Sequence, residues 1–217
     1  MPEPAPRVTA ILPRLTTLCA LIMSLLWCGC GKPPMLVHQY LLEYPAPPVK
    51  ATPVAESLKV EKFAVAQAFN TTAMVYRTGP YKAETYNYSR WRVNPGYQVT
   101  DFLIRDLRES RLFQAVLPAD SATKARFDLE GGVERIEEVD QGEVWQAALV
   151  LNLTLLDTEE KDITKRVIFQ KNYRAEEPLT EKTPEGLAQS MSRAMERLSA
   201  QIITDVYQAI KKVSRKP

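Results

Sequence analysis

The sequence is poor in the residues that most often carry metal or acid–base chemistry. Histidine occurs once, at His38, and the three cysteines, Cys19, Cys28 and Cys30, all lie within the first thirty residues. A metal site of histidines and cysteines lacks its ligands, and a catalytic triad would need His38 as its base. No GxxxxGK[ST] or GxGxxG phosphate-binding sequence is present. We therefore expect no catalytic residue, no metal and no bound cofactor.

An excess of charge of either sign is also missing. The 217 residues carry 28 Lys and Arg against 26 Asp and Glu, a formal net charge of +2. Such a chain has no broad positive field, so we expect no nucleic-acid partner. Repeats of solenoid period are absent. About 160 residues follow the N-terminal region and its linker, a length typical of one domain with one core.

The chain lacks an apolar run long enough to span a bilayer. Residues 15–27 carry no charge, but as a helix they would measure only about 20 Å against roughly 30 Å of hydrocarbon. Arg7 and Arg14 precede this run. A basic start followed by a short apolar stretch is typical of a cleaved signal peptide. We predict a signal peptide over residues 1–29.

Cys30 is the predicted lipid acceptor. The pattern Trp27-Cys28-Gly29-Cys30 resembles a bacterial lipoprotein signal, in which small residues precede the modified cysteine. Gly29 before Cys30 suits processing, whereas Trp27 before Cys28 is bulky. Trp27 also stands three places before Cys30, where leucine is usual, so an ordinary secretory signal or an uncleaved anchor remains the alternative. Gly31, rather than aspartate, follows Cys30, which resembles the class sorted to the outer membrane.

The remaining chain divides into three parts. Residues 30–57 are rich in proline and predict a semi-rigid tether that contains a short strand within 36–44. Residues 58–213 form the predicted domain, and 214–217 form a basic tail. If the signal is cleaved, Cys30 is the one cysteine left in the mature chain, which can then form no internal disulfide.

Apolar alternation predicts a series of strands within the domain. They cover 58–65, where a slip in the alternation suggests a bulge, and 71–78, 85–91, 126–133, 144–157 and 165–175.

Helical periodicity predicts two helices. The first covers 99–113, with Thr100 or Asp101 as N-cap, and the second covers 184–213, with Thr183 as N-cap. The pattern indicates an α+β fold of two layers, an antiparallel or mixed sheet packed by two helices. The second helix would be about 45 Å long, so we expect part of its apolar stripe to meet another subunit.

An aromatic cluster is the candidate interface. Tyr86, Tyr88, Trp91 and Tyr97 lie within a short stretch, with Trp91 on the opposite face of its strand from Tyr86 and Tyr88. Tyrosine and tryptophan are enriched at protein interfaces, but packing on a half-buried sheet explains them equally well. Both interpretations remain open.

A run of acids follows the strand over 126–133. Glu134, Glu137, Glu138 and Asp140 could imitate a pair of catalytic carboxylates. We instead expect a solvated strand end, because charged residues are mostly exposed.

The order and spacing of these segments resemble the ABC-type transport auxiliary lipoprotein family, which includes the lipoprotein of the paraquat-inducible operon. The segments that carry the resemblance follow the predicted lipid-accepting cysteine. They are Tyr40-Leu41-Leu42, Leu58-Lys59-Val60, Met74-Val75-Tyr76-Arg77, Tyr88-Ser89-Arg90-Trp91, Leu107 to Phe113, Phe127 to Gly131 and the long final helix.

This resemblance implies a non-catalytic role in lipid transport across the periplasm. The expected partners are an ABC transporter and a periplasmic MCE-domain protein, and the expected location is the periplasmic face of the outer membrane, with a lipid anchor and a homo-oligomeric state. The alternative is a structural or assembly lipoprotein of the cell envelope that acts through protein contacts alone.

We predict that Cys30→Ser abolishes labelling with palmitate and leaves an unprocessed precursor, because the thiol that receives the lipid is removed. Metabolic labelling with radioactive palmitate and gel mobility measure both effects. Cys28→Ser is the matched control and should change neither. Continued labelling of the Cys30→Ser protein would move the acceptor to Cys28.

Overall fold

The computed structural model describes residues 35–215. The predicted signal peptide, Cys30 and the last two residues of the basic tail lie outside this range. A mixed sheet and two α-helices make up the described domain. The strands are β1 (His38–Tyr40), β2 (Val54–Val60), β3 (Ala64–Val65), β4 (Ala73–Gly79), β5 (Lys82–Trp91), β6 (Phe113–Pro118), β7 (Phe127–Gln141), β8 (Val144–Asp157) and β9 (Val167–Pro178). The helices are α2 (Pro95–Glu109) and α3 (Pro184–Val213), with short 3₁₀ turns η1 (Gln67–Phe69) and η2 (Ile163–Lys165).

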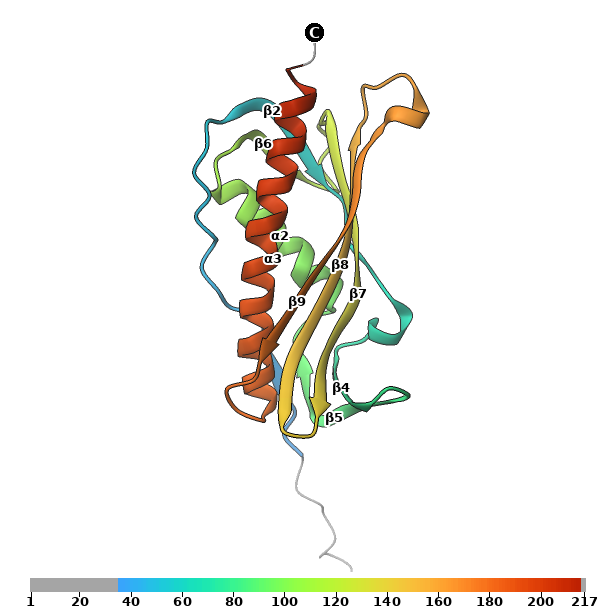
Figure 1. Ribbon diagram of the computed structural model, residues 1–217, viewed down its shortest axis with the longest axis vertical. Coiled ribbons are helices and arrows are strands. Elements are labelled where there is room, and N and C mark those ends of the chain that lie inside the picture. Colours follow the sequence, from blue (N-terminus) through green and yellow to red (C-terminus); the bar gives the residue numbers. More distant parts are fainter. Residues whose placement is uncertain (1–34, 216–217) are drawn as a thin grey trace, which may run out of the picture. The chain divides into compact units, whose positions relative to one another are not determined.

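The long strand β7 organises the sheet. One edge of β7 pairs with β8 in antiparallel register, and β9 extends this meander. The other edge pairs in turn with β2, β3 and β4, all parallel to β7. β6 extends the sheet beyond β2, while β5 and β1 extend it beyond β4. The sheet therefore forks, with β2 and β6 at one end of the domain and β4, β5 and β1 at the other (Figure 1).

Both helices pack on the sheet and contact each other, α3 against β8 and β9 and α2 against β6 and β7. The core lies between these two layers, which confirms the predicted α+β fold. Thr183 caps α3 by accepting a hydrogen bond from the Gly186 amide at 3.0 Å, and Pro184 occupies the first turn. The predicted bounds and cap of this helix are confirmed.

The apolar stripe of α3 is buried from Leu187 to Ile210. It needs no second subunit to cover it, contrary to the expectation from its length. The reason is the size of the meander, because β8 has 14 residues and such a strand extends over about 45 Å, as far as the helix.

The first helix begins earlier than predicted. Asn94 is its N-cap and accepts from the Gly96 amide at 3.0 Å, with Pro95 at the first position. The Asn-Pro-Gly sequence is therefore the start of α2. Thr100, predicted as a cap, lies inside the helix and donates to the Gly96 carbonyl at 2.7 Å.

Two strand predictions are also corrected. The single bulged strand predicted over 58–65 is two strands, β2 and β3, and β6 was not predicted. β7 continues past its predicted end at 133 to Gln141. A bulge between Val133 and Arg135 shifts the alternation there, which disguises the second half of the strand in the sequence.

The chain after β1 is packed into the domain. Leu42 and Tyr44 are buried in the core, and the Leu42 amide donates to Gln98 Oε1 at 3.1 Å. Further along, Tyr207 of α3 donates to the Thr52 carbonyl at 2.7 Å. This part of the proline-rich segment is therefore fixed to both helices.

Asp106 joins three separate parts of this arrangement. Its fully buried carboxylate accepts hydrogen bonds from Tyr44 Oη at 2.8 Å and Ser199 Oγ at 2.6 Å. Arg105 Nε adds a third at 2.8 Å, and its guanidinium lies over the Tyr44 ring at 4.6 Å. A buried carboxylate is tolerated only with such partners. The segment after β1, α2 and α3 therefore meet on one side chain.

We predict that Asp106→Ala lowers the free energy of unfolding by about 3–5 kcal/mol, because buried hydroxyls of Tyr44 and Ser199 lose their acceptor and Arg105 its counter-charge. Urea denaturation followed by circular dichroism measures the change. Asp101→Ala, an exposed position on the same helix, is the matched control and should stay within about 0.5 kcal/mol of the unmodified chain. Equal stability of the two variants would contradict the assignment.

Candidate functional site

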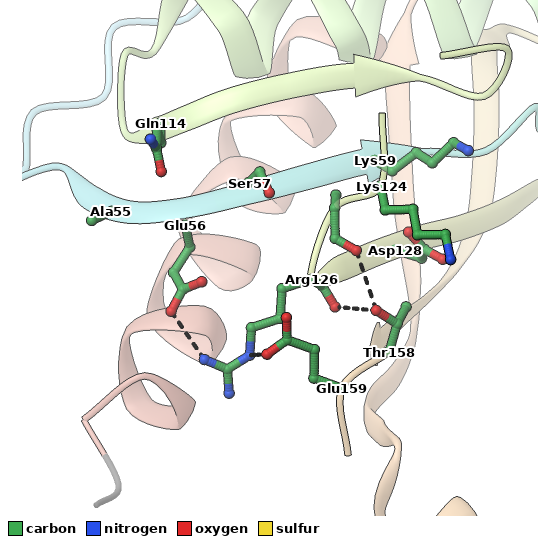
Figure 2. Close-up of a pocket in the computed structure, with 11 residues that line it drawn as sticks. Ala55, Glu56, Ser57, Lys59, Gln114, Lys124, Arg126, Asp128, Thr158 and Glu159 are labelled. Carbon is green, nitrogen blue, oxygen red and sulfur yellow. Dashed lines mark hydrogen bonds and ion pairs between the residues drawn. The ribbon is translucent and has the colours of Figure 1, made fainter. Parts of the chain in front are cut away.

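A groove of about 720 Å³ opens where β2, β6, the start of β7 and the end of β8 meet (Figure 2). Charged side chains dominate its lining. They are Glu56, Lys59, Lys124, Arg126, Asp128 and Glu159. The groove lies at the fork end formed by β2 and β6, the end of the domain at which α3 also ends (Figure 1).

Arg126 connects the strands that form the groove. Its Nη2 and Nε donate to the two oxygens of Asp157 at 3.0 and 3.3 Å, and its Nη1 donates to Glu56 at 3.1 Å. These hydrogen bonds, first of all that to Asp157, raise the pKa of Arg126. Because Glu56 is on β2 and Asp157 ends β8, one guanidinium connects both strands to the start of β7. Figure 2 shows its pairing with Glu56. A paired planar fork of this kind fixes position as well as charge.

The other groups of the groove suit binding more than bond-breaking. Burial raises the pKa of Asp128, and Thr158 Oγ1 donates to the carbonyls of Ala125 and Arg126 at 3.2 and 2.9 Å. Lys124 is exposed and, within residues 35–215, forms no ion pair shorter than 4.0 Å. His38 lies on β1 and not among the lining residues. The groove therefore offers a charged, polar surface rather than a nucleophile activated by a base.

The Arg126–Asp157 pair was not predicted from the sequence, because apolar alternation predicts strands but not the register in which they pair. The register of the β7–β8 hairpin explains the pair, since Phe127 lies opposite Asp157. That pairing brings Arg126, one residue before Phe127, to the carboxylate.

The predicted solvated strand end is wrong for two of its acids, since Glu137 and Glu138 are buried. Arg77 of β4 holds Glu137 with two hydrogen bonds, Nε to Oε1 at 3.0 Å and Nη2 to Oε2 at 3.1 Å, and Arg135 adds another contact. The segment is covered because β4 pairs with β7 at Glu138, so this part of β7 is interior to the sheet.

Glu138 points to the opposite face from Glu137, as neighbours in a strand do. Its Oε2 accepts from Tyr86 Oη at 2.9 Å, and Tyr86 packs on Tyr76 with ring centroids 4.9 Å apart. Within the described residues, its Oε1 has no hydrogen-bond partner. Burial raises the pKa of Glu138. The two carboxylates therefore do not form an acid–base pair, because the sheet separates them.

The four aromatic residues of the candidate interface are not one surface. Trp91 is 2% exposed and belongs to the core, on the opposite face of β5 from Tyr88, as predicted. Tyr86 is half-buried beside Glu138. Tyr88 and Tyr97 are 46% and 56% exposed, so these two are accessible to a partner.

Two further observations, on metal ligands and on membrane-spanning helices, apply to residues 35–215 alone. They contain no group of three or more His, Cys, Asp or Glu side chains placed to hold a metal ion. None of the helices in this part of the chain has the length and apolar character needed to span a bilayer.

We predict that Glu138→Gln raises the melting temperature at pH 8 and that this gain shrinks towards pH 4. Because the pKa of Glu138 is higher in the folded chain than in the unfolded chain, its contribution to stability is complete below the unfolded value of about 4.5. That contribution is lost as the pH rises through the folded value. Differential scanning calorimetry at several pH values measures the effect.

The matched control is Glu134→Gln, an exposed position on the same strand, which should show no such pH dependence. A pH-independent change in the Glu138→Gln protein would contradict a raised pKa for this carboxyl.

The domain resembles several solved structures at low sequence identity. A protein from Xanthomonas campestris of the DUF330 family is 19% identical and covers 83% of this chain and 100% of its own, with a TM-score of 0.75. An uncharacterized protein, at 13% identity, covers 79% and 99% with a TM-score of 0.63. A hypothetical protein from Chlamydia trachomatis, at 10% identity, covers 72% and 98% with a TM-score of 0.52. These likenesses establish a shared fold.

A search of curated proteins gives no match. The family model described as the ABC-type transport auxiliary lipoprotein component matches residues 40–203. The match runs from the end of β1 into α3, so it includes strands β2 to β9, α2, most of α3 and the charged groove. The resemblance seen in the sequence is confirmed, and the chain belongs to the family of ABC-type transport auxiliary lipoprotein components.

Proposed function

We propose that this protein is a lipid-anchored, non-catalytic component of an MCE/ABC-type system that moves phospholipid across the periplasm. Lipid on Cys30 holds it to the periplasmic face of the outer membrane. Its task is to dock the periplasmic MCE-domain protein, which belongs with the ABC transporter. The observation that carries the proposal is the family match over residues 40–203.

The character of the groove supports docking over lipid carriage. A site that encloses a lipid tail needs an apolar lining, whereas the groove is lined by paired ions and lysines. Charged surfaces of this kind steer partners and fix their register. Arg126 pairs with Glu56 and Asp157, and Lys59 reaches Glu61 only at 4.0 Å, so Lys59 and Lys124 can meet acidic groups of a partner.

The position of the groove supports the same function. β7 meets β2 near Leu129 and β4 near Glu138, so the two fork ends lie about 30 Å apart along the strand. The chain from Cys30 enters at β1, in the fork arm of β4 and β5. An anchored domain would therefore present the groove away from its membrane, towards a partner in the periplasm.

We predict that the full-length protein, captured from detergent-solubilised membranes, brings down an MCE-domain protein and ABC transporter subunits. The charge-reversed protein Lys59→Glu/Lys124→Glu should recover about tenfold less of them, because like charges would meet across the interface. Mass spectrometry of the captured material measures both.

Lys182→Glu, an exposed lysine before α3 at the other end of the domain, is the matched control and should not reduce recovery. Capture that lacks any MCE or ABC component would contradict the proposal. If the protein instead brings down outer-membrane assembly factors, and phospholipid distribution is normal without it, the protein is an assembly lipoprotein.

A further inference from the structure

Exposed apolar side chains gather on β1 and on the chain beside it. Leu41 is 54% exposed. Val37 is also exposed, and it precedes β1 as Leu41 follows it. Tyr88 of β5, Val93 on the chain that leads into α2 and Tyr97 in the first turn of α2 are exposed as well. Monomeric soluble proteins seldom expose neighbouring apolar groups in this way unless the surface binds something.

The strand register places some of these side chains on one outward surface. β1 pairs with β5 in parallel, Gln39 with Arg90 and Tyr40 with Trp91. Trp91 and Tyr40 pack towards the core, so the alternate positions point outward. We call this surface the anchor-side face and define it by Val37, Leu41, Tyr88, Arg90 and Arg92, all of them exposed.

Two arginines are part of this face. Arg90 and Arg92 are two residues apart and so lie on the same side of the extended chain. Arg92 Nη1 donates to Gln39 Oε1 of β1 at 2.7 Å. Within residues 35–215, neither forms an ion pair shorter than 4.0 Å with an acidic group. Their guanidinium groups are thus available to an anionic partner, beside aliphatic and aromatic groups.

We propose that the anchor-side face lies against the surface of a phospholipid bilayer that contains anionic headgroups. The proposal rests on the lipid anchor at Cys30, which is part of the proposed function. Leu41 and Val37 enter the boundary between headgroups and acyl chains, and Tyr88 lies at the headgroup level. Arg90 and Arg92 bind lipid phosphates while their aliphatic stems stay in contact with the apolar groups.

The length of the connecting chain supports this occupant. Val37 lies seven positions after Cys30, and a fully extended chain of that length reaches only about 25 Å. Beyond Val37 the chain cannot swing away, because β1 pairs with β5 and Leu42 is buried in the core. A lipid on Cys30 would therefore keep this face close to the bilayer at a high effective concentration.

The charges argue against a second copy of the chain as the occupant. In a two-fold dimer the same patch meets itself, so Arg90 and Arg92 would approach the same arginines of the other copy. Like charges that face each other are unfavourable, whereas an anionic bilayer attracts both.

A single introduced cysteine tests the proposal. If Cys30 carries lipid, an added cysteine is the one thiol of the mature chain that a nitroxide can label. The lipidated protein is placed in vesicles of phosphatidylethanolamine and phosphatidylglycerol, with Leu41→Cys as probe and Ile163→Cys as matched control. Ile163 is 74% exposed and lies in η2, near the C-terminal end of the domain (Figure 1).

We expect the label at position 41 to be accessible to oxygen and protected from an aqueous nickel chelate, and the label at position 163 to show the reverse. In the Leu41→Cys background, Arg90→Gln/Arg92→Gln should weaken the protection on the order of tenfold. Replacement of phosphatidylglycerol by phosphatidylcholine should have the same effect. The exposed pair Lys124→Gln/Lys161→Gln, at the other end, should have none.

Flotation of the vesicles distinguishes a protein that lacks the lipid anchor from an anchored protein whose anchor-side face does not contact the bilayer. Protein that does not float with them lacks the anchor, which would overturn both the proposed function and this inference. Protein that floats, but whose label at position 41 is as open to the chelate as the label at 163, would overturn the inference alone. A label shielded from both reagents in detergent solution would overturn it in favour of a second copy.

Discussion

The buried carboxylate of Asp106 in α2 joins both helices to the segment that follows β1. The chain from the predicted anchor enters the domain at β1. Asp106 accepts hydrogen bonds from Tyr44 and Ser199, which belong to the segment after β1 and to α3. If these polar groups were buried without partners, each would cost free energy of folding. In this network they form hydrogen bonds with one another. Because of this arrangement, the segment after β1 is connected to both helices through one side chain. An anchored protein that must present a surface in a fixed orientation needs such a rigid connection.

The second constraint is the sharing of β7. Its first half pairs with β2 and its second half with β4, and the bulge after Val133 separates the two. The fork that results gives the domain two chemically different ends. One contains the groove organised by Arg126, and the other contains the anchor-side face with its arginines and exposed apolar groups. The proposed function of a lipid-anchored docking protein would use this polarity, with one end for the membrane and one for the partner.

Sequence patterns predicted the longest apolar elements well, but they missed β6, the second half of β7 and the buried polar groups. The bounds of β8 and α3 follow from periodicity, because each buries one continuous apolar face. The burial of Glu137 could not be predicted in this way, since it depends on a bulge and on pairing with a distant strand. Arg126 and Asp157 were missed for a similar reason, because their contact depends on hairpin register. Local pattern determines elements, whereas long-range pairing determines which charges are buried.

In the proposed arrangement the two ends of the domain meet different partners, phospholipid at the anchor-side face and the MCE-domain protein at the groove. Photo-crosslinking in intact cells tests it most directly, with a photoreactive amino acid placed at position 41 or at position 124. The account predicts that position 41 crosslinks to phospholipid and position 124 to the MCE-domain protein. Crosslinks from position 124 to lipid, or from both positions to the same protein partner, would contradict it.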